Sequence, residues 1–157
     1  MPKLHLTLTV NGEQRELLID PRRTLLDVLR NDLELRGAHR GCDSGDCGAC
    51  TVLLEGQPIT SCLILAADCD GMEVLTVEGV TPAGGLHPVQ RTLVEKGGIQ
   101  CGFCTPGMVM AAIALLNDNP HPTAEDVREG LAGNLCRCTG YKKIVEAVRS
   151  VNGGRAG

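Results

Sequence analysis

The stretch GCDSGDCGAC, residues 41–50, places three cysteines in the spacing C-x4-C-x2-C. They are Cys42, Cys47 and Cys50, and Cys62 follows further along the chain. Plant-type [2Fe–2S] clusters are held by four cysteine thiolates in this kind of arrangement. Structural zinc sites favour pairs of short C-x2–4-C knuckles, and this half of the chain holds a single C-x2-C. The stretch therefore predicts an iron–sulfur site rather than a zinc site.

Three glycines in the same stretch favour a loop that wraps closely around a compact anion. Gly41, Gly45 and Gly48 let the backbone adopt positive φ angles and come close to a bound group. The backbone N–H groups can then point at the cysteine sulfurs, which stabilises negative charge and tunes the redox potential. We expect the loop to hold its cluster through both thiolates and amides.

A second set of four cysteines lies in the other half of the chain. Cys101 and Cys104 form C-x2-C in IQCGFCTPG, and Cys136 and Cys138 lie in GNLCRCTGY. A disulfide across one residue would be strained, so the second pair indicates a metal centre that is shared with ligands from elsewhere. Each pair precedes a predicted helix, whose N-terminal N–H groups and positive dipole end would face an anion. Taken alone, this set suits zinc almost as well as an iron–sulfur cluster, because both accept four thiolates.

The remaining cysteine and the chain's N-terminus bear on its compartment. Cys69 has no partner at a ligand spacing, so we interpret it as a spare thiol. The total of nine cysteines is odd, and the N-terminal residues lack the apolar region of a signal peptide. No apolar run is long enough to span a membrane. We expect a cytoplasmic, reduced protein whose thiolates hold metal.

Composition limits the other possibilities. The chain has 157 residues, enough for one ordinary domain or two small ones, and 43% of them are hydrophobic. Its aromatic residues are Phe103 and Tyr141, so the core must be aliphatic and buries less area per residue. The net charge is −4, and no Lys or Arg lies between Arg40 and Arg91, whereas the final segment is basic. This distribution argues against a nucleic-acid-binding surface.

The first half of the chain shows the patterns of an α+β unit. Apolar residues alternate from Leu4 to Val10, and the Asn11-Gly12 pair predicts a hairpin turn. Thr24 and Asp27 resemble a capping box that opens a helix. The other expected elements are a return strand over 16–19, strands over 51–54 and 59–63 around a turn at 55–58, and a last strand over 72–77.

The second half shows helical patterns after a stretch rich in Gly and Pro. We expect a ferredoxin-like domain over residues 1–78, a linker over 79–88, a helical domain over 89–151 and a frayed tail over 152–157. The predicted helices are 87–96, a second from a Thr105 cap with Pro106 at its first position to about 117, a third from a Thr123 cap to about 130, and 141–151. They form a small four-helix domain.

Together, GCDSGDCGAC, QCGFCTPGM and GNLCRCTGY resemble the iron–sulfur subunit of the molybdenum hydroxylases. This family includes xanthine dehydrogenase, aldehyde oxidoreductase, aerobic carbon monoxide dehydrogenase and 4-hydroxybenzoyl-CoA reductase. The resemblance covers about residues 3–151, and all eight ligand positions are present. It implies a β-grasp, plant-type ferredoxin-like domain followed by a four-helix bundle, each with one [2Fe–2S] cluster.

The resemblance also implies roles for particular residues and partners. The cluster of the helical half would lie next to a molybdopterin, which Gln100 and Cys138 would approach. The cluster of the ferredoxin-like half would lie nearer to FAD. Molybdopterin and FAD are expected on separate large and medium subunits, in a dimer of heterotrimers. The chain would be the non-catalytic subunit of an oxidoreductase, without a catalytic residue of its own.

Three more side chains lie near the cysteines in the sequence. His39 precedes the first set, but four cysteines already suffice as ligands, so it is not expected to bind iron. Phe103 lies between Cys101 and Cys104 and is interpreted as a hydrophobic shield. Tyr141 is expected to pack in the same way or to form a hydrogen bond.

Two other functional classes stay open at this point. A free, ferredoxin-like electron carrier would need only the first half of the chain. A zinc-stapled interaction module would use the same thiolates for a colourless metal. The sequence favours an electron-transfer subunit that relays single electrons between a molybdopterin site and FAD.

Overall fold

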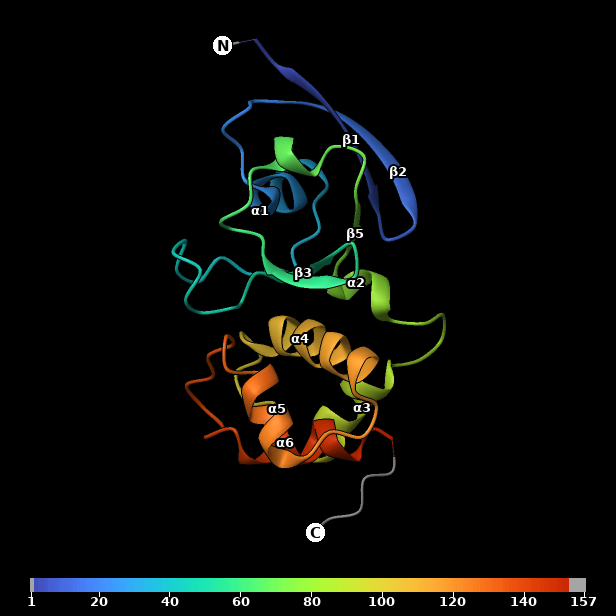
Figure 1. Cartoon of the computed structure of the whole chain (residues 1–157), viewed down its shortest axis with the longest axis vertical. Helices are drawn as coiled ribbons and strands as arrows, with labels where there is room; N and C mark the ends of the chain where they lie inside the picture. The colour runs from blue at the N-terminus through green and yellow to red at the C-terminus, as the bar shows by residue number, and fades with distance from the viewer. Residues whose placement is uncertain (1, 153–157) are drawn as a thin grey trace.

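The computed structural model describes residues 2–152, and Figure 1 shows its strands gathered towards the N-terminal end and its longer helices towards the C-terminal end. The elements of the first half are β1 (Leu4–Val10), β2 (Glu13–Ile19), α1 (Leu25–Asp27), the π-helical turn η1 (Val28–Asp32), β3 (Thr51–Leu54), β4 (Gln57–Thr60), the 3-10 turn η2 (Ala66–Cys69) and β5 (Glu73–Leu75). The helices that follow are α2 (Val77–Val80), α3 (Pro88–Glu95), α4 (Thr105–Asp118), α5 (Ala124–Gly130) and α6 (Lys142–Ser150).

The five strands form one mixed sheet in the order β2-β1-β5-β3-β4. β1 pairs with β5 in parallel, and the other neighbours are antiparallel. Asn11 and Gly12 join β1 to β2 with φ angles of 52° and 81°, as a tight hairpin turn requires. The α+β prediction and the ferredoxin-like first half are confirmed.

β3 is buried on both faces and links two hydrophobic cores. Val52 points into the core of the first half, with Leu6, Leu8 and the buried side of α1. Its neighbour Leu53 points the other way, into the core of the helical half. Side chains alternate along a strand, so one strand serves both cores.

α4 is the central helix of the second half and lies against the sheet (Figure 1). Its residues are buried without interruption from Gly107 to Ala114. A helix that is apolar all round must be covered on every side, and here β3, α3 and α5 cover it. The sheet and the helical half therefore share an extensive face.

The strand boundaries differ from those predicted. The return strand β2 begins at Glu13 rather than at residue 16 because the two-residue turn lets pairing start at once. β4 spans Gln57–Thr60 instead of 59–63, and Pro58 lies inside it. Proline is tolerated there because β4 is an edge strand of the sheet. The last strand ends at Leu75, and α2 takes up the residues that follow.

The helix boundaries also needed corrections. The helix capped by Thr24 widens to a π-helical turn at Val28. Cys104, not Thr105, occupies the N-cap of α4, and α6 begins only after Tyr141, whose φ of 68° is left-handed. Thr123 caps α5 as predicted, and together with Asp126 it forms a capping box.

The segment expected as a linker, residues 79–88, overlaps the end of α2 and the first residue of α3. Residues 81–87 between these two helices form no helix or strand. The tail expected at 152–157 lies, apart from Asn152, outside the described residues.

Candidate metal centres

The first four predicted ligands come together around the loop that precedes β3. Cys42 is exposed, Cys47 is half-buried, and Cys50 and Cys62 are buried. Cys50 is the last loop residue before β3, and its carbonyl accepts a hydrogen bond from Ser61 Oγ at 2.8 Å. This bond ties the loop to the residue that precedes Cys62.

Backbone amides of the loop point at sulfur, as the glycine pattern predicts. The N–H groups of Ser44 and Cys47 each donate to Cys42 Sγ at 3.4 Å. The N–H of Ala49 donates to Cys47 Sγ at 3.5 Å. Hydrogen bonds from Ser44 and then Cys47 lower the pKa of the Cys42 thiol to about 6, because they stabilise the thiolate.

The four thiols of the first set lie near one another. Burial raises the pKa of Cys47, and the neighbouring Cys42 thiol adds to the shift. Burial likewise raises the pKa of Cys62 to about 11, with Cys50 as the next cause. Within residues 2–152, no three His, Cys, Asp or Glu side chains lie close enough to hold a single metal ion. A [2Fe–2S] cluster spreads its four cysteine ligands over two irons, so it does not need three of them at one metal ion.

Close packing around the loop explains two of its glycines. A Cβ on Gly41 would lie 2.7 Å from Cys47 Sγ. Gly45 has a φ of 82°, and a Cβ there would lie 2.4 Å from the Leu63 side chain. Four thiols, two of them with amide donors on their sulfurs, around a loop that is tightly packed at Gly41 and Gly45, fit a [2Fe–2S] cluster.

Three cysteines of the second set, Cys101, Cys104 and Cys136, line a cavity between the start of α4 and the loop before α6. The cavity has a volume of about 480 Å³ and is lined by Cys101, Phe103, Cys104, Leu135, Cys136, Arg137 and Tyr141. Cys138 is exposed and lies outside this lining. Burial raises the pKa of the Cys104 thiol to about 12, and the neighbouring Cys136 is the next cause. Cys104 and Cys136 are therefore neighbours across the cavity.

Cys136 is held by hydrogen bonds on both its backbone and its sulfur. Its N–H donates to the Tyr141 hydroxyl oxygen at 2.9 Å, so Tyr141 forms the hydrogen bond that was one of its two predicted roles. Its Sγ lies 3.1 Å from Thr139 Oγ1. Burial alone would raise the pKa of Cys136, but hydrogen bonds from Thr139 and from the Cys138 amide lower it. Three lining thiols and a hydroxyl on sulfur fit a second cluster.

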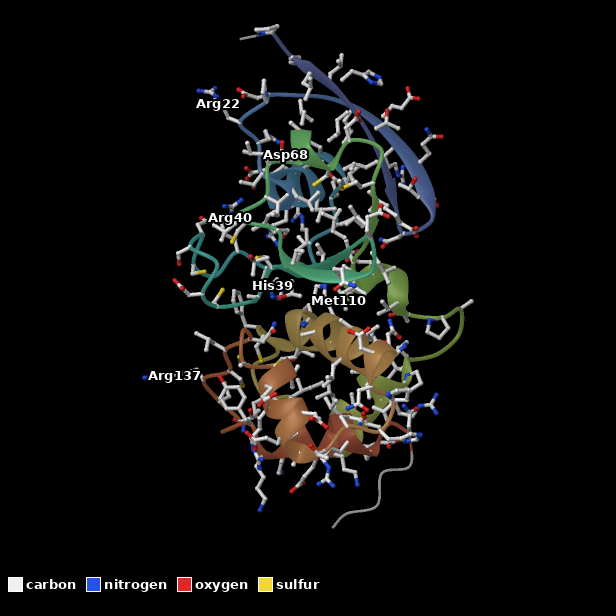
Figure 2. The ribbon with its side chains drawn as sticks, viewed as in Figure 1. Arg22, His39, Arg40, Asp68, Met110 and Arg137 are labelled. Atoms are coloured by element: carbon white, nitrogen blue, oxygen red, sulfur yellow. The ribbon has the colours of Figure 1, made fainter. Side chains whose placement is uncertain are left out.

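The two cysteine sets meet across the contact between the halves, which sequence reasoning did not foresee. The N–H of Leu135 donates to Cys47 O at 2.9 Å, which joins a residue next to one set to a member of the other. His39 Nδ1 lies 2.8 Å from Phe103 O, and the two rings stack with centroids 4.7 Å apart. Figure 2 shows His39 at the boundary between the sheet and the helices. The position of Phe103 beside the second cavity agrees with a shielding role, although its ring is half exposed.

Asn134 is a further contact residue that sequence reasoning missed. It is a buried polar residue, and its side chain bonds to the first loop. In the sequence, Asn134 follows Gly133 and precedes the apolar Leu135 and the predicted ligand Cys136. This position alone is too weak a signal to identify an interface residue.

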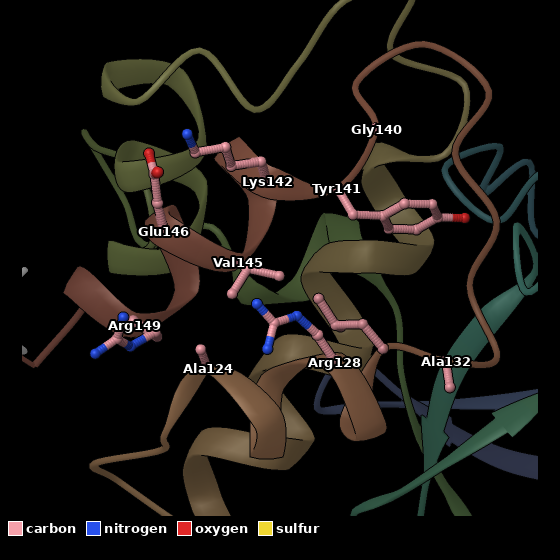
Figure 3. Close-up of a pocket in the computed structure, with 10 residues that line it drawn as sticks. Ala124, Arg128, Ala132, Gly140, Tyr141, Lys142, Val145, Glu146 and Arg149 are labelled. Atoms are coloured by element: carbon pink, nitrogen blue, oxygen red, sulfur yellow. The ribbon is translucent and has the colours of Figure 1, made fainter. Parts of the chain in front are cut away.

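Another cavity lies between α5 and α6 (Figure 3). Its volume is about 530 Å³, and it is lined by Ala124, Arg128, Leu131, Ala132, Gly140, Tyr141, Lys142, Val145, Glu146 and Arg149. None of these residues is a cysteine. Redox chemistry therefore belongs to the two cysteine sets rather than to this cavity.

Cys69 stands apart from both sets. It is fully buried in the core of the first half, and its Sγ lies 3.7 Å from Leu65 O. Burial raises the pKa of its thiol, and Asp68 adds to the shift. Its surroundings match the spare thiol predicted from the sequence.

Among the described residues, no helix combines the length and the apolar character that a membrane crossing needs.

Comparisons with known proteins identify both halves. A family described as "2Fe-2S iron-sulfur cluster binding domain" matches residues 8–74, and one described as "[2Fe-2S] binding domain" matches residues 76–149. Both descriptions favour iron–sulfur clusters over the zinc-stapled module that the sequence left open. The second match also accounts for the helical half, which a free ferredoxin-like carrier would not need.

Complete relatives are similar along nearly the whole chain. The chain is 47% identical over 149 residues to the nicotinate dehydrogenase small FeS subunit of Eubacterium barkeri, with 95% of each chain covered. It is 49% identical over 151 residues to the nicotine 6-hydroxylase small subunit of Paenarthrobacter nicotinovorans, with 96% of this chain and 91% of that one covered. Among solved structures, quinoline 2-oxidoreductase from Pseudomonas putida 86 superposes with a TM-score of 0.93 at 41% identity, over 96% of this chain and 93% of that one.

Proposed function

This chain belongs to the small iron–sulfur subunits of the molybdenum hydroxylases, and we propose that it relays single electrons between a molybdopterin on a large subunit and FAD on a medium subunit. It is the two-[2Fe–2S] electron-transfer subunit of an oxidoreductase complex. The bound clusters supply the one-electron redox chemistry. The chain's own residues bind the clusters, shield them and fix them relative to each other.

We assign the ligands of the two clusters to the two cysteine sets. The first set is Cys42, Cys47, Cys50 and Cys62, and the second is Cys101, Cys104, Cys136 and Cys138. The amide donors on the first set and the thiol-lined cavity of the second support this assignment. Cys69 is left out because it is fully buried and its Sγ contacts Leu65 O.

One observation carries the proposed relay, whose direction follows the family resemblance. The inner sides of the two sets are joined by the hydrogen bond from Leu135 N to Cys47 O, 2.9 Å long. Cys42 of the first set is exposed, and Cys138 and Gln100 of the second half are exposed as well. Exposed ends with a connected middle suit a relay. We place the molybdopterin near Gln100 and Cys138, and FAD nearer to the first set.

The same proposal extends to the assembly and its location. The relatives are described as small subunits of dehydrogenases and hydroxylases, which supports separate partner chains. We propose a dimer of heterotrimers with one molybdopterin subunit and one FAD subunit per copy. The nine cysteines, an odd number of which eight have ligand spacings, favour a cytoplasmic location.

We also propose that the chain is organised as a ferredoxin-like domain over residues 1–78, a linker over 79–88 and a helical domain over 89–151. Separate domains predict separable clusters. Cys47→Ser should therefore remove or alter one of two EPR signals and spare the other. Loss of both signals in a chain that still folds would argue for a single site.

The direction of the relay is tested with the assembled complex. With Cys47→Ser, substrate should still reduce molybdenum and the helical cluster, while turnover with the flavin's acceptor falls sharply. With Cys136→Ser, electrons should remain on molybdenum. Rapid-freeze EPR of both variants distinguishes these states. If the Cys136→Ser complex reduced its flavin at the normal rate, the assigned order would be wrong.

A further inference from the structure

Asn134 is buried at the contact between the two cysteine sets. Its side chain is 6% exposed, and its Nδ2 donates to Gly48 O at 3.0 Å and to Thr51 Oγ1 at 3.2 Å. Both acceptors belong to the first half, whereas Asn134 precedes Leu135 and Cys136 in the second. A single buried amide therefore ties the first cysteine loop to the second.

The backbones around Asn134 touch directly. A Cβ on Gly48 would lie 2.2 Å from Gly133 O, and a Cβ on Gly107 would lie 2.3 Å from Gly48 O. No side chain separates the first loop from the loop before Cys136 or from α4 at these points. A small displacement of either loop therefore changes the spacing of the two sets, since nothing compressible lies between them.

The neighbouring residue makes the only bond that joins the two sets through the backbone within residues 2–152. Leu135 N donates to Cys47 O at 2.9 Å, and Leu135 is followed directly by Cys136. One path of bonds therefore connects the sulfur of Cys47 with the sulfur of Cys136. It runs through the Cys47 carbonyl and the hydrogen bond to Leu135 N, and Cys136 is the next residue in the chain.

We propose that Asn134 is a positioning residue for electron transfer between the two clusters. The Asn134 side-chain amide donates a hydrogen bond to Gly48 O, the carbonyl that follows that of Cys47. This bond fixes the loop so that Cys47 O stays within hydrogen-bond distance of the Leu135 N–H. Asn134 touches neither set of sulfurs itself. Its effect is to fix the separation and the electronic coupling of the clusters.

The donor character of Asn134 is the decisive property. Gly48 O also accepts hydrogen bonds from Thr51 N at 3.1 Å and Thr51 Oγ1 at 2.7 Å, so it is a strongly bonded acceptor. Asn134→Asp keeps the size of the side chain but places an acceptor with negative charge against this carbonyl. The contact should then open locally while each cysteine set keeps its own ligands.

The test uses the full chain with both clusters loaded, and it rests on the proposed ligand sets. EPR spectra are recorded with one cluster reduced and with both reduced. In the unsubstituted chain, the signals should split or broaden when both clusters are reduced, because two nearby spins interact. In Asn134→Asp this splitting should be lost or clearly reduced, while each cluster keeps its own g values.

Asn119→Asp is the matched control. Asn119 Nδ2 also donates to an oxygen, Asp126 Oδ2 at 3.3 Å, but this contact lies wholly within the helical half. The same chemical change there should leave the splitting intact. A lower melting temperature in both variants with unchanged splitting in Asn134→Asp would show a merely structural role and overturn the proposal.

Asn134→Ser supplies a second variant that brings no charge into the contact. If neither variant assembled two clusters, Asn134 would be needed for assembly rather than for coupling, and the proposal would fall. An unsubstituted chain without two cluster signals would instead overturn the ligand assignment of the proposed function, so the two failures are distinguishable.

Discussion

At Gly48, backbone atoms of the two halves of the molecule meet directly. Its φ is 70°, and a Cβ would overlap Gly133 O at 2.2 Å. Alanine at this position would destabilise the fold in two ways. It would adopt a left-handed backbone conformation, and its Cβ would clash with a backbone atom that cannot move aside as a flexible side chain can. The sequence predicts a need for glycine in this loop, but the opposing carbonyl comes from a distant segment and is visible only in the fold.

Gly48→Ala should lower the free energy of unfolding and the iron content together. The strained backbone alone costs about 1–2 kcal/mol, and the clash with Gly133 adds to it. Gly56→Ala is the control, because Gly56 has a similar φ of 79° and a Cβ there would meet no atom within 4 Å. Thermal unfolding and iron analysis measure both effects. Equal losses in the two variants would contradict the account of the contact.

Cys69 and Cys62 permit a second comparison between buried thiols. Cys69→Ala should leave both clusters in place and cost about 1 kcal/mol of stability through lost packing. Cys62→Ala should remove the cluster of the first half. Iron and sulfide analysis with EPR checks both variants. Full cluster content in Cys62→Ala, or loss of a cluster in Cys69→Ala, would contradict the assigned ligand set.

At the scale of elements, α3 begins with an unusual cap. His87 Nδ1 accepts the Val89 N–H at 3.2 Å, and Gln90 Oε1 accepts the His87 N–H at 2.8 Å. An imidazole nitrogen accepts only when it is unprotonated. Burial accordingly lowers the pKa of His87 below its ordinary value of 6.5.

This cap predicts a pH dependence of stability. Between the lowered folded pKa and about 6.5, the unfolded chain binds more protons at His87 than the folded chain does. Stability should therefore rise with pH in this window, and acidification from about pH 7.5 towards about pH 5.5 should weaken the cap. His87→Asn keeps a good N-cap without a titrating ring. The fall in melting temperature on acidification should be smaller in this variant than in the unsubstituted chain; an equal fall would refute the assignment.

Local patterns predicted the elements whose cause is local. The hairpin at Asn11 and the capping boxes at Thr24 and Thr123 depend on neighbouring residues, and each is present. β4 and α2 depend on tertiary context: Pro58 is allowed because its strand lies at an edge, and α2 forms where the sheet meets the helical half. The thiol spacings predicted both sites, but not the contacts of Asn134 and His39, which join segments far apart in the sequence.

At the scale of the whole molecule, the shared face between sheet and helices brings the two cysteine sets next to each other. β3 contributes Val52 to one core and Leu53 to the other, so the two halves pack as neighbours around a single strand. Cys47 lies in the loop before β3. Its carbonyl accepts a hydrogen bond from Leu135 N, which lies in the same loop as Cys136. The fold thus connects the sites internally while Cys42 and Cys138 stay exposed.

The central claim is that each cysteine set holds its own [2Fe–2S] cluster. The most direct measurement is the iron, acid-labile sulfide and zinc content of the purified full-length chain, with a visible spectrum of the same sample. Two clusters require about four iron and four sulfide per chain and a reddish-brown colour. Stoichiometric zinc without visible absorbance, or iron and sulfide near two each per chain, would contradict the claim.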